Sequence, residues 1–179
     1  MVTTELFVGL KVPDNTAITA FHTLERIGYN KLKKVERQDY YKFEFSGDVK
    51  GFQSKISAVD ILVNANKHQY SFNLERNNNE NARKSEIHGS KASSTTSVVF
   101  GINSVEIKKI NVLVQNLDDA KSLLSVLRTR LGFKNIKNVE KGVLWSLSID
   151  ADKKEAENIA IEITKNLLMN ENYQKFKVV

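Results

Sequence analysis

The stretch RIGYNKLKKVE at residues 26–36 returns as RLGFKNIKNVE at residues 130–140. Corresponding positions lie 104 residues apart, as Gly28 and Gly132 show. In both copies an apolar helical pattern ends at the glycine, an aromatic residue follows, and an alternating strand pattern begins. The two glycines predict turns, because a residue without Cβ takes the left-handed conformation that ends a helix without strain. This internal repeat decides the predicted architecture.

The same order of elements is predicted around each copy. The first half reads as a strand at 6–12, a helix capped by Asp14 or Thr16, strands at 32–37 and 40–45 (or one long bent strand), a helix from Asp48 to about Val63, and a strand at 70–74. The second half reads as a strand at 107–114, a helix starting at Asn116 or Asp118, strands at 136–141 and 143–149, a helix capped by Asp150 or Asp152, and a strand at 173–179.

This order predicts an α+β protein built from two ferredoxin-like βαββαβ repeats with antiparallel sheets, at residues 1–75 and 105–179. Residues 76–104 are polar and lack periodicity, so they are predicted to be a flexible linker, with a short strand at 98–100.

Each repeat is expected to carry its helices on one face of its sheet and to leave the other face open. Four apolar residues fall on the open face: Phe7, Tyr40, Leu113 and Leu144. A patch of this kind needs a cover, and the other repeat would supply it in a pseudo-twofold sandwich. Alternatively, the open sheet edges extend the sheet into a partner.

Composition limits the class of protein. The 179 residues include no cysteine, which excludes a disulfide framework and thiol chemistry and suits a reducing cytosol. Neither a signal peptide nor an apolar run near the ~18 residues of a membrane span is recognised, so a cytoplasmic protein is expected. The formal charge of +6 is spread without a run of five basic residues, which favours a mixed solvated surface over a nucleic-acid-binding arm.

No catalytic constellation is recognised. His22, His68 and His88 have neither metal-ligand spacing nor a carboxylate partner in the pattern, and we interpret them as surface residues. Asp118 and Asp119 are interpreted as helix-capping groups. No serine stands in a glycine-flanked elbow, and no glycine loop is suited to cradle phosphate.

One aromatic strand raises the possibility of RNA binding. RNA-recognition motifs are also βαββαβ, and they stack bases on aromatics of the third strand. Tyr41, Phe43 and Phe45 alternate in this way, but the basic-Gly-aromatic-Gly-aromatic pattern is absent. Strand alternation places these three side chains on the core face, so they are predicted to be core residues.

The chain resembles PurS, the small subunit of bacterial phosphoribosylformylglycinamidine synthetase. The resemblance rests on Leu10-Lys11 at a strand end, the glycine-aromatic turn, Val-x-x-Val before the long strand, and Leu167-Leu168-Met169-Asn170 near the end. It covers both repeats, so the chain looks like a covalent version of a PurS dimer. Of the family's Val-Arg-x-Gly-Lys pattern only Gly142 is kept, within residues 139–143; residues 35–39 are the first copy.

The resemblance implies a non-catalytic scaffold in purine biosynthesis. Such a subunit bridges a PurL-like synthetase and a PurQ-like glutaminase in a ligase complex, so that ammonia passes between them. ATP, Mg and glutamine would then belong to the partners, and this chain would hold no cofactor or metal. The implied partner-contact residues are Arg37, Lys141, Gly142, Asn64 and Asn170, although both asparagines also suit helix stops. Self-association through sheet edges is a further expectation, while membrane and nucleic-acid partners are not expected.

Two alternatives stay open from the sequence. A ferredoxin-like module that binds a small ligand between its repeats would act as a regulator. An RNA-binding module would show strongly salt-dependent binding.

Overall fold

A computed structural model describes residues 1–74, 107–117 and 120–179. In chain order its elements are β1 (Val2–Leu10), α1 (Asn15–Arg26), β2 (Leu32–Phe45), α2 (Val49–Ile56), β3 (His68–Ser71), β4 (Ile107–Asn116), α3 (Lys121–Thr129), β5 (Ile136–Asp150), α4 (Lys153–Ile163), the π-helix η1 (Thr164–Leu168) and β6 (Gln174–Val178). The predicted linker at 76–104, its strand at 98–100, and Asp118–Asp119 lie outside the described residues.

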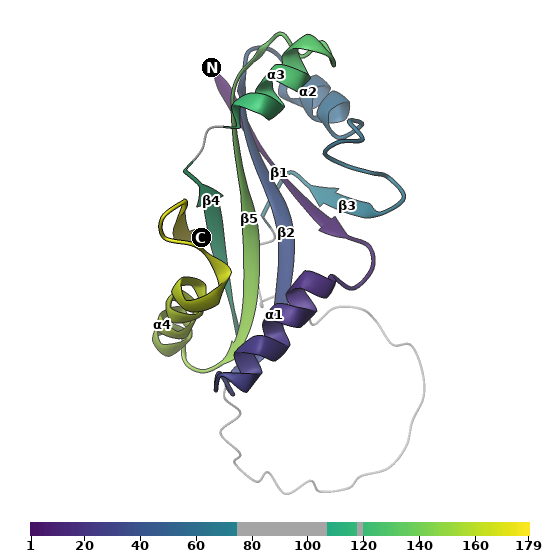
Figure 1. The fold of residues 1–179 in the computed structure, drawn as a ribbon. Coiled ribbons are helices and arrows are strands. Elements are labelled where there is room, and N and C mark those ends of the chain that lie inside the picture. Colours follow the sequence, from purple (N-terminus) through teal and green to yellow (C-terminus); the bar gives the residue numbers. More distant parts are fainter. Residues whose placement is uncertain (75–106, 118–119) are drawn as a thin grey trace, which may run out of the picture.

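All six strands form one antiparallel sheet in the order β3-β1-β2-β5-β4-β6 (Figure 1). The predicted α+β class with antiparallel pairing is confirmed. The predicted sandwich of two facing sheets is wrong, because the halves meet edge to edge through β2 and β5, from Leu32 opposite Ile149 to Phe45 opposite Ile136. This pairing satisfies backbone groups along strand edges that a face-to-face sandwich would leave open.

Each half contains one long central strand where two strands were the main prediction. Residues 32–45 form a single strand, which was the alternative, and residues 136–150 are also continuous, so each half reads βαβαβ. Gly142 does not break β5. A Cβ there would lie 2.5 Å from the carbonyl oxygen of Val114, so glycine allows β4 to approach β5 closely.

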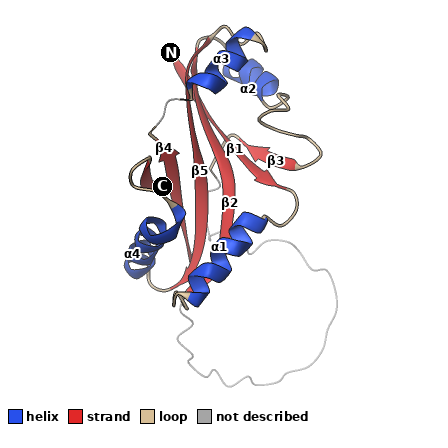
Figure 2. Cartoon of the chain, viewed as in Figure 1, coloured by secondary structure: helices blue, strands red, loops and turns tan. Residues whose placement is uncertain are grey.

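The helices lie in two pairs on one face of the sheet, and each pair combines both halves (Figure 2). In one core cluster Leu24 of α1 joins Ala160 of α4 over Leu147 of β5. In the other, Phe52 of α2 joins Leu127 of α3. Both hydrophobic cores therefore draw on sequence from before and after the predicted linker.

The predicted helix ends are largely confirmed. The carboxylates of Asp14, Asp48 and Asp152 accept backbone N–H groups at the starts of α1, α2 and α4. Gly28 and Gly132 have φ of 107° and 78°, as the repeat predicted. Two boundaries differ: α3 begins at Lys121, after Asn116 has closed β4, and α2 ends at Ile56, short of Val63.

The face without helices carries Phe7, Tyr40, Leu113 and Leu144, as predicted, but not as an exposed patch. Their exposed fractions are only 1–3%, and Leu74 packs against them. Tyr41, Phe43 and Phe45 lie on the helix-covered face with exposed fractions of 0–6%, so the prediction that they are core residues is confirmed.

Two glycines of the sheet provide a matched test of close packing. We expect Gly142→Ala to lower the free energy of unfolding by about 3 kcal/mol, because its methyl group meets a backbone oxygen that cannot move away. At Gly9 a Cβ would stand 3.5 Å from Gln38, an ordinary contact, so Gly9→Ala should change stability by less than about 0.5 kcal/mol. Urea unfolding of both variants measures the difference, and equal losses would contradict the assigned role of Gly142.

Candidate functional site

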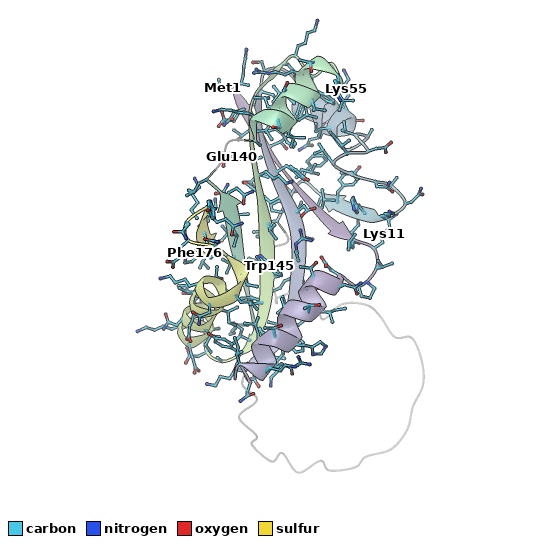
Figure 3. The ribbon with its side chains drawn as sticks, viewed as in Figure 1. Met1, Lys11, Lys55, Glu140, Trp145 and Phe176 are labelled. Atoms are coloured by element: carbon cyan, nitrogen blue, oxygen red, sulfur yellow. The ribbon has the colours of Figure 1, made fainter. Side chains whose placement is uncertain are left out.

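A strip of the sheet lies between the two helix pairs, where the ribbons of β2 and β5 are not crossed by a helix (Figure 1). We call it the central strip; it comprises Arg37, Asp39 and Tyr41 of β2 and Lys141, Val143 and Trp145 of β5. In the register Arg37 stands opposite Trp145, and Tyr41 stands opposite Lys141. Tyr41 and Trp145 are buried in the flanking cores, whereas the residues between them are partly exposed. Figure 3 places Trp145 midway along β5.

Arg37 is held by two carboxylates. Its Nη1 donates to Asp14 at 3.3 Å and its Nη2 donates to Asp39 at 2.8 Å. Asp14 is also the N-cap of α1, since its Oδ1 accepts the N–H of Thr16 at 2.8 Å. The guanidinium therefore ties the start of α1 to the centre of the sheet, and its side chain keeps 27% of its surface exposed.

Lys141 is more exposed than Arg37. It lies on the same face of the sheet as Arg37 and is exposed. Within the described ranges no carboxylate lies within ion-pairing distance of its ammonium group. A surface lysine of this kind remains able to pair with an acidic group of another molecule.

The other three predicted contact residues lie elsewhere or have a clear local role. Gly142 is a buried backbone position in β5 beside the strip. Asn64 and Asn170 are at the turns before β3 and β6, where their Oδ1 atoms accept the N–H of Asn66 and Asn172, both at 3.0 Å. Asn170 follows the end of η1, as the helix-stop interpretation proposed, but α2 ends at Ile56, well before Asn64, so Asn64 stabilises a turn and does not stop a helix. The structure brings neither asparagine to the strip.

Burial and charge decide which groups of this region titrate. Burial, with a smaller contribution from Asp39, raises the pKa of Tyr41 to about 12, although Arg37 acts in the opposite sense. Burial and the neighbouring Glu5, whose carboxylate accepts the Tyr40 hydroxyl at 2.7 Å, also raise the pKa of Tyr40. Both phenols are therefore neutral near pH 7, and neither is suited to act as a base.

An ion-pair network lies on the helix-free face, on the opposite side of the sheet. Glu140 (Figure 3) accepts Lys42 Nζ at 3.1 Å and Gln115 Nε2 at 2.9 Å. Burial alone would raise the pKa of Glu140, but these hydrogen bonds and the lysine charges outweigh burial and hold the pKa below its usual value. Lys34 and Lys109 likewise outweigh the effect of burial on Glu36 and hold its pKa below the usual value.

The structure gives two of the histidines neighbours that the sequence pattern did not show. Nδ1 of His22 lies 3.2 Å from Glu25 on α1, so this histidine does have a carboxylate neighbour, but the pair is exposed. Nδ1 of His68 accepts the N–H of Asn64 at 3.1 Å, and His88 lies outside the described residues. Among residues 1–74, 107–117 and 120–179, no three acidic or histidine side chains gather as a metal site would require.

Sequence reasoning missed the contacts that join the two halves. The hydroxyl of Tyr29 donates to Glu162 at 3.0 Å and accepts Asn166 at 2.8 Å. Lys31 also pairs with Glu155. No local pattern signals pairs so distant in the chain, and only their shared place at the ends of α1 and α4 brings them together.

The fold and this site define a class: an α+β protein whose central surface is a charged strip between helix pairs, over a sheet shared by both halves. The family comparison is more specific. Residues 110–179 match the family model described as PurS, phosphoribosylformylglycinamidine (FGAM) synthase. This range runs from β4 to the end of the chain, so the predicted resemblance to PurS is confirmed for the second half. No curated protein gave a significant match. Among the helices of the described residues, none combines the length and the apolar character that a membrane-spanning helix needs.

The double role of Asp14 gives a first test of the site. We expect Asp14→Ala to lower the free energy of unfolding by about 1–2 kcal/mol, because both the helix cap and a partner of Arg37 are lost. Asp14→Asn keeps the capping oxygen and loses only the charge, so its cost should be about 0.5 kcal/mol. Urea unfolding measures both variants. Equal costs would show that the charge, and not the cap, is the main contribution.

Glu140 gives a test by pH. A depressed folded-state pKa contributes stability at neutral pH, and this contribution disappears as the pH falls below the ordinary carboxyl value of 4.5. We expect Glu140→Gln to melt about 2 °C below the wild type at pH 7, since the pair is about one third exposed, and the gap should close near pH 3. Glu171→Gln, at an exposed position, is the control. A gap that stays constant across this pH range would contradict the role of the ionised carboxylate.

Proposed function

We propose that this chain is a non-catalytic bridging subunit of the FGAM synthetase complex of purine biosynthesis. In this role it acts in the cytoplasm and docks a PurL-like synthetase and a PurQ-like glutaminase, so that ammonia passes from one to the other. The observation that carries the proposal is the PurS match over residues 110–179. ATP, Mg and glutamine are bound by the partner subunits in this proposal.

We also propose that the chain is a tandem pair of PurS-like repeats, at 1–75 and 105–179, joined by residues 76–104. Several observations support a duplication. The glycine turns at Gly28 and Gly132 and the asparagine turns at Asn64 and Asn170 occur at corresponding places. In addition, Asp39 and Val143, which are 104 residues apart, face each other at the middle of the β2–β5 register. A local twofold axis between two copies of one unit would pass through this pair.

The central strip supports a docking role. It lies on the long strands that join the two halves, and it offers both the exposed ammonium of Lys141 and the partly exposed guanidinium of Arg37. A polar, solvent-accessible surface of this kind is typical of the rim of a protein interface. We therefore assign the partner contact to Arg37 and Lys141, and we assign Asn64 and Asn170 to turn formation.

Reconstitution with the PurL-like and PurQ-like proteins tests the function. We expect omission of this chain to abolish most glutamine-dependent synthesis and to leave ammonia-dependent synthesis largely unchanged, because free ammonia does not need transfer. Lys141→Glu should weaken association about tenfold, since it reverses a charge at the interface rim. Lys154→Glu, at an exposed position of α4, is the matched control. A complex that assembles and uses glutamine equally well without this chain would refute the proposal.

A further inference from the structure

In the described part of the chain, one stretch of β2 has a neighbouring strand on one side only. β1 pairs with β2 no further than Val8 opposite Asp39, and its last residues pair with β3 instead. β2 nevertheless starts at Leu32, and β5 follows it along its whole length. Residues 33–38 of β2 therefore expose one backbone edge with no strand partner among the described residues. Such an edge accepts a further strand through its N–H and C=O groups.

A cavity of ≈ 780 Å³ lies along this edge. Residues 33–38 of β2 form one side, the β1–α1 connection and α1 form another, and β3 contributes its end. We call this cavity the β2 groove. It lies within the size range of pockets that bind ligands, and it follows a strand edge.

The two sides of the groove differ in polarity because they belong to opposite faces of the sheet. On the helix-covered side the lining includes Val12, Ile18 and Tyr70, whose exposed fractions of 65%, 42% and 48% are high for apolar residues, together with the ion pair of Asp14 and Arg37. On the helix-free side the lining includes the polar side chains of Gln38 and Gln69, together with Leu74 and Leu144. A strand placed along β2 would present alternate side chains to the exposed apolar residues on the helix-covered side and to the polar and charged residues on the helix-free side.

The charges on the helix-free side of the groove determine which polar side chains an incoming strand should carry. On the helix-free side Glu36 lies between Lys34, at 2.7 Å, and Lys109, at 3.5 Å. One carboxylate therefore faces two ammonium groups, which leaves an excess positive charge on this wall. An acidic side chain on the incoming strand would balance that charge.

From these observations we propose that the β2 groove binds an extended segment of a partner protein, in which apolar and acidic residues alternate, by adding it as a strand to residues 33–38. The inference rests on the proposed function only in that the chain docks partner proteins. It adds a second contact surface, which shares Arg37 with the central strip but does not include Lys141, and it states the chemistry of the segment that this surface takes.

Peptide binding to the full chain tests the proposal. The probe is a fluorescein-labelled octapeptide in which Val and Glu alternate, measured by fluorescence anisotropy. One comparison peptide has four Val followed by four Glu, and another alternates Val with Lys. We expect the alternating acidic peptide to bind at least about tenfold more tightly than either, because it alone matches both walls. Hydrogen exchange should slow on binding at those amides of residues 33–38 that point away from β5, while residues 41–45, already paired with β1, should not change.

Paired variants locate the site. Ile18→Asp should weaken peptide binding about tenfold. Lys34→Gln should weaken it about threefold. Ile61→Asp and Lys154→Gln change exposed residues away from the groove and should bind as the wild type does. No binding up to millimolar peptide, equal binding of the three peptides, or unchanged exchange in residues 33–38 would each overturn the proposal.

These outcomes are independent of the proposed function. A failure of reconstitution with normal peptide binding would refute the bridging role and keep the groove as a docking site for another partner. The reverse result would keep the bridging role and remove the groove from it.

Discussion

The antiparallel pairing of β2 with β5 is the interaction on which the structure depends. It runs from Leu32 opposite Ile149 to Phe45 opposite Ile136 and turns two three-stranded units into one sheet of six. Because the paired strands are long, each extends under helices from the other half, so α1 packs beside α4 and α2 beside α3. A loss of this pairing would expose backbone groups and divide both hydrophobic cores. The halves are therefore parts of one cooperative unit.

The same pairing sets the chemistry of both sheet faces. Between the helix pairs it leaves the central strip, where Arg37 is fixed by two carboxylates and Lys141 remains exposed. On the helix-free face it aligns Lys42 with Glu140, and the resulting ion pair keeps that carboxylate charged. These charges are arranged for structure and recognition, and the buried phenols of Tyr40 and Tyr41 stay protonated. This distribution agrees with the docking role that we propose for the chain.

Much of the local structure could be predicted from the sequence. The glycine turns, the carboxylate caps at Asp14, Asp48 and Asp152, and the core role of the alternating aromatics in β2 follow from short-range rules that each segment obeys alone. The continuity of β5 was less predictable, since a glycine such as Gly142 suggests the end of a strand. In the structure Gly142 instead allows β4 to lie close to β5. The boundary of α3 was missed because Ala120, without a capping side chain, starts it.

By itself the sequence determined the repeated order of elements, the faces on which apolar residues lie, and the resemblance to PurS, because these depend on periodicity and on neighbouring residues. Only the tertiary structure decided that the halves join edge to edge, that Arg37 is bound to Asp14 and Asp39, and that part of β2 beside α1 has an edge without a strand partner in residues 1–74, 107–117 and 120–179. The physical reason is that strand pairing and ion pairing depend on register between segments about a hundred residues apart, which a pattern within one segment does not contain.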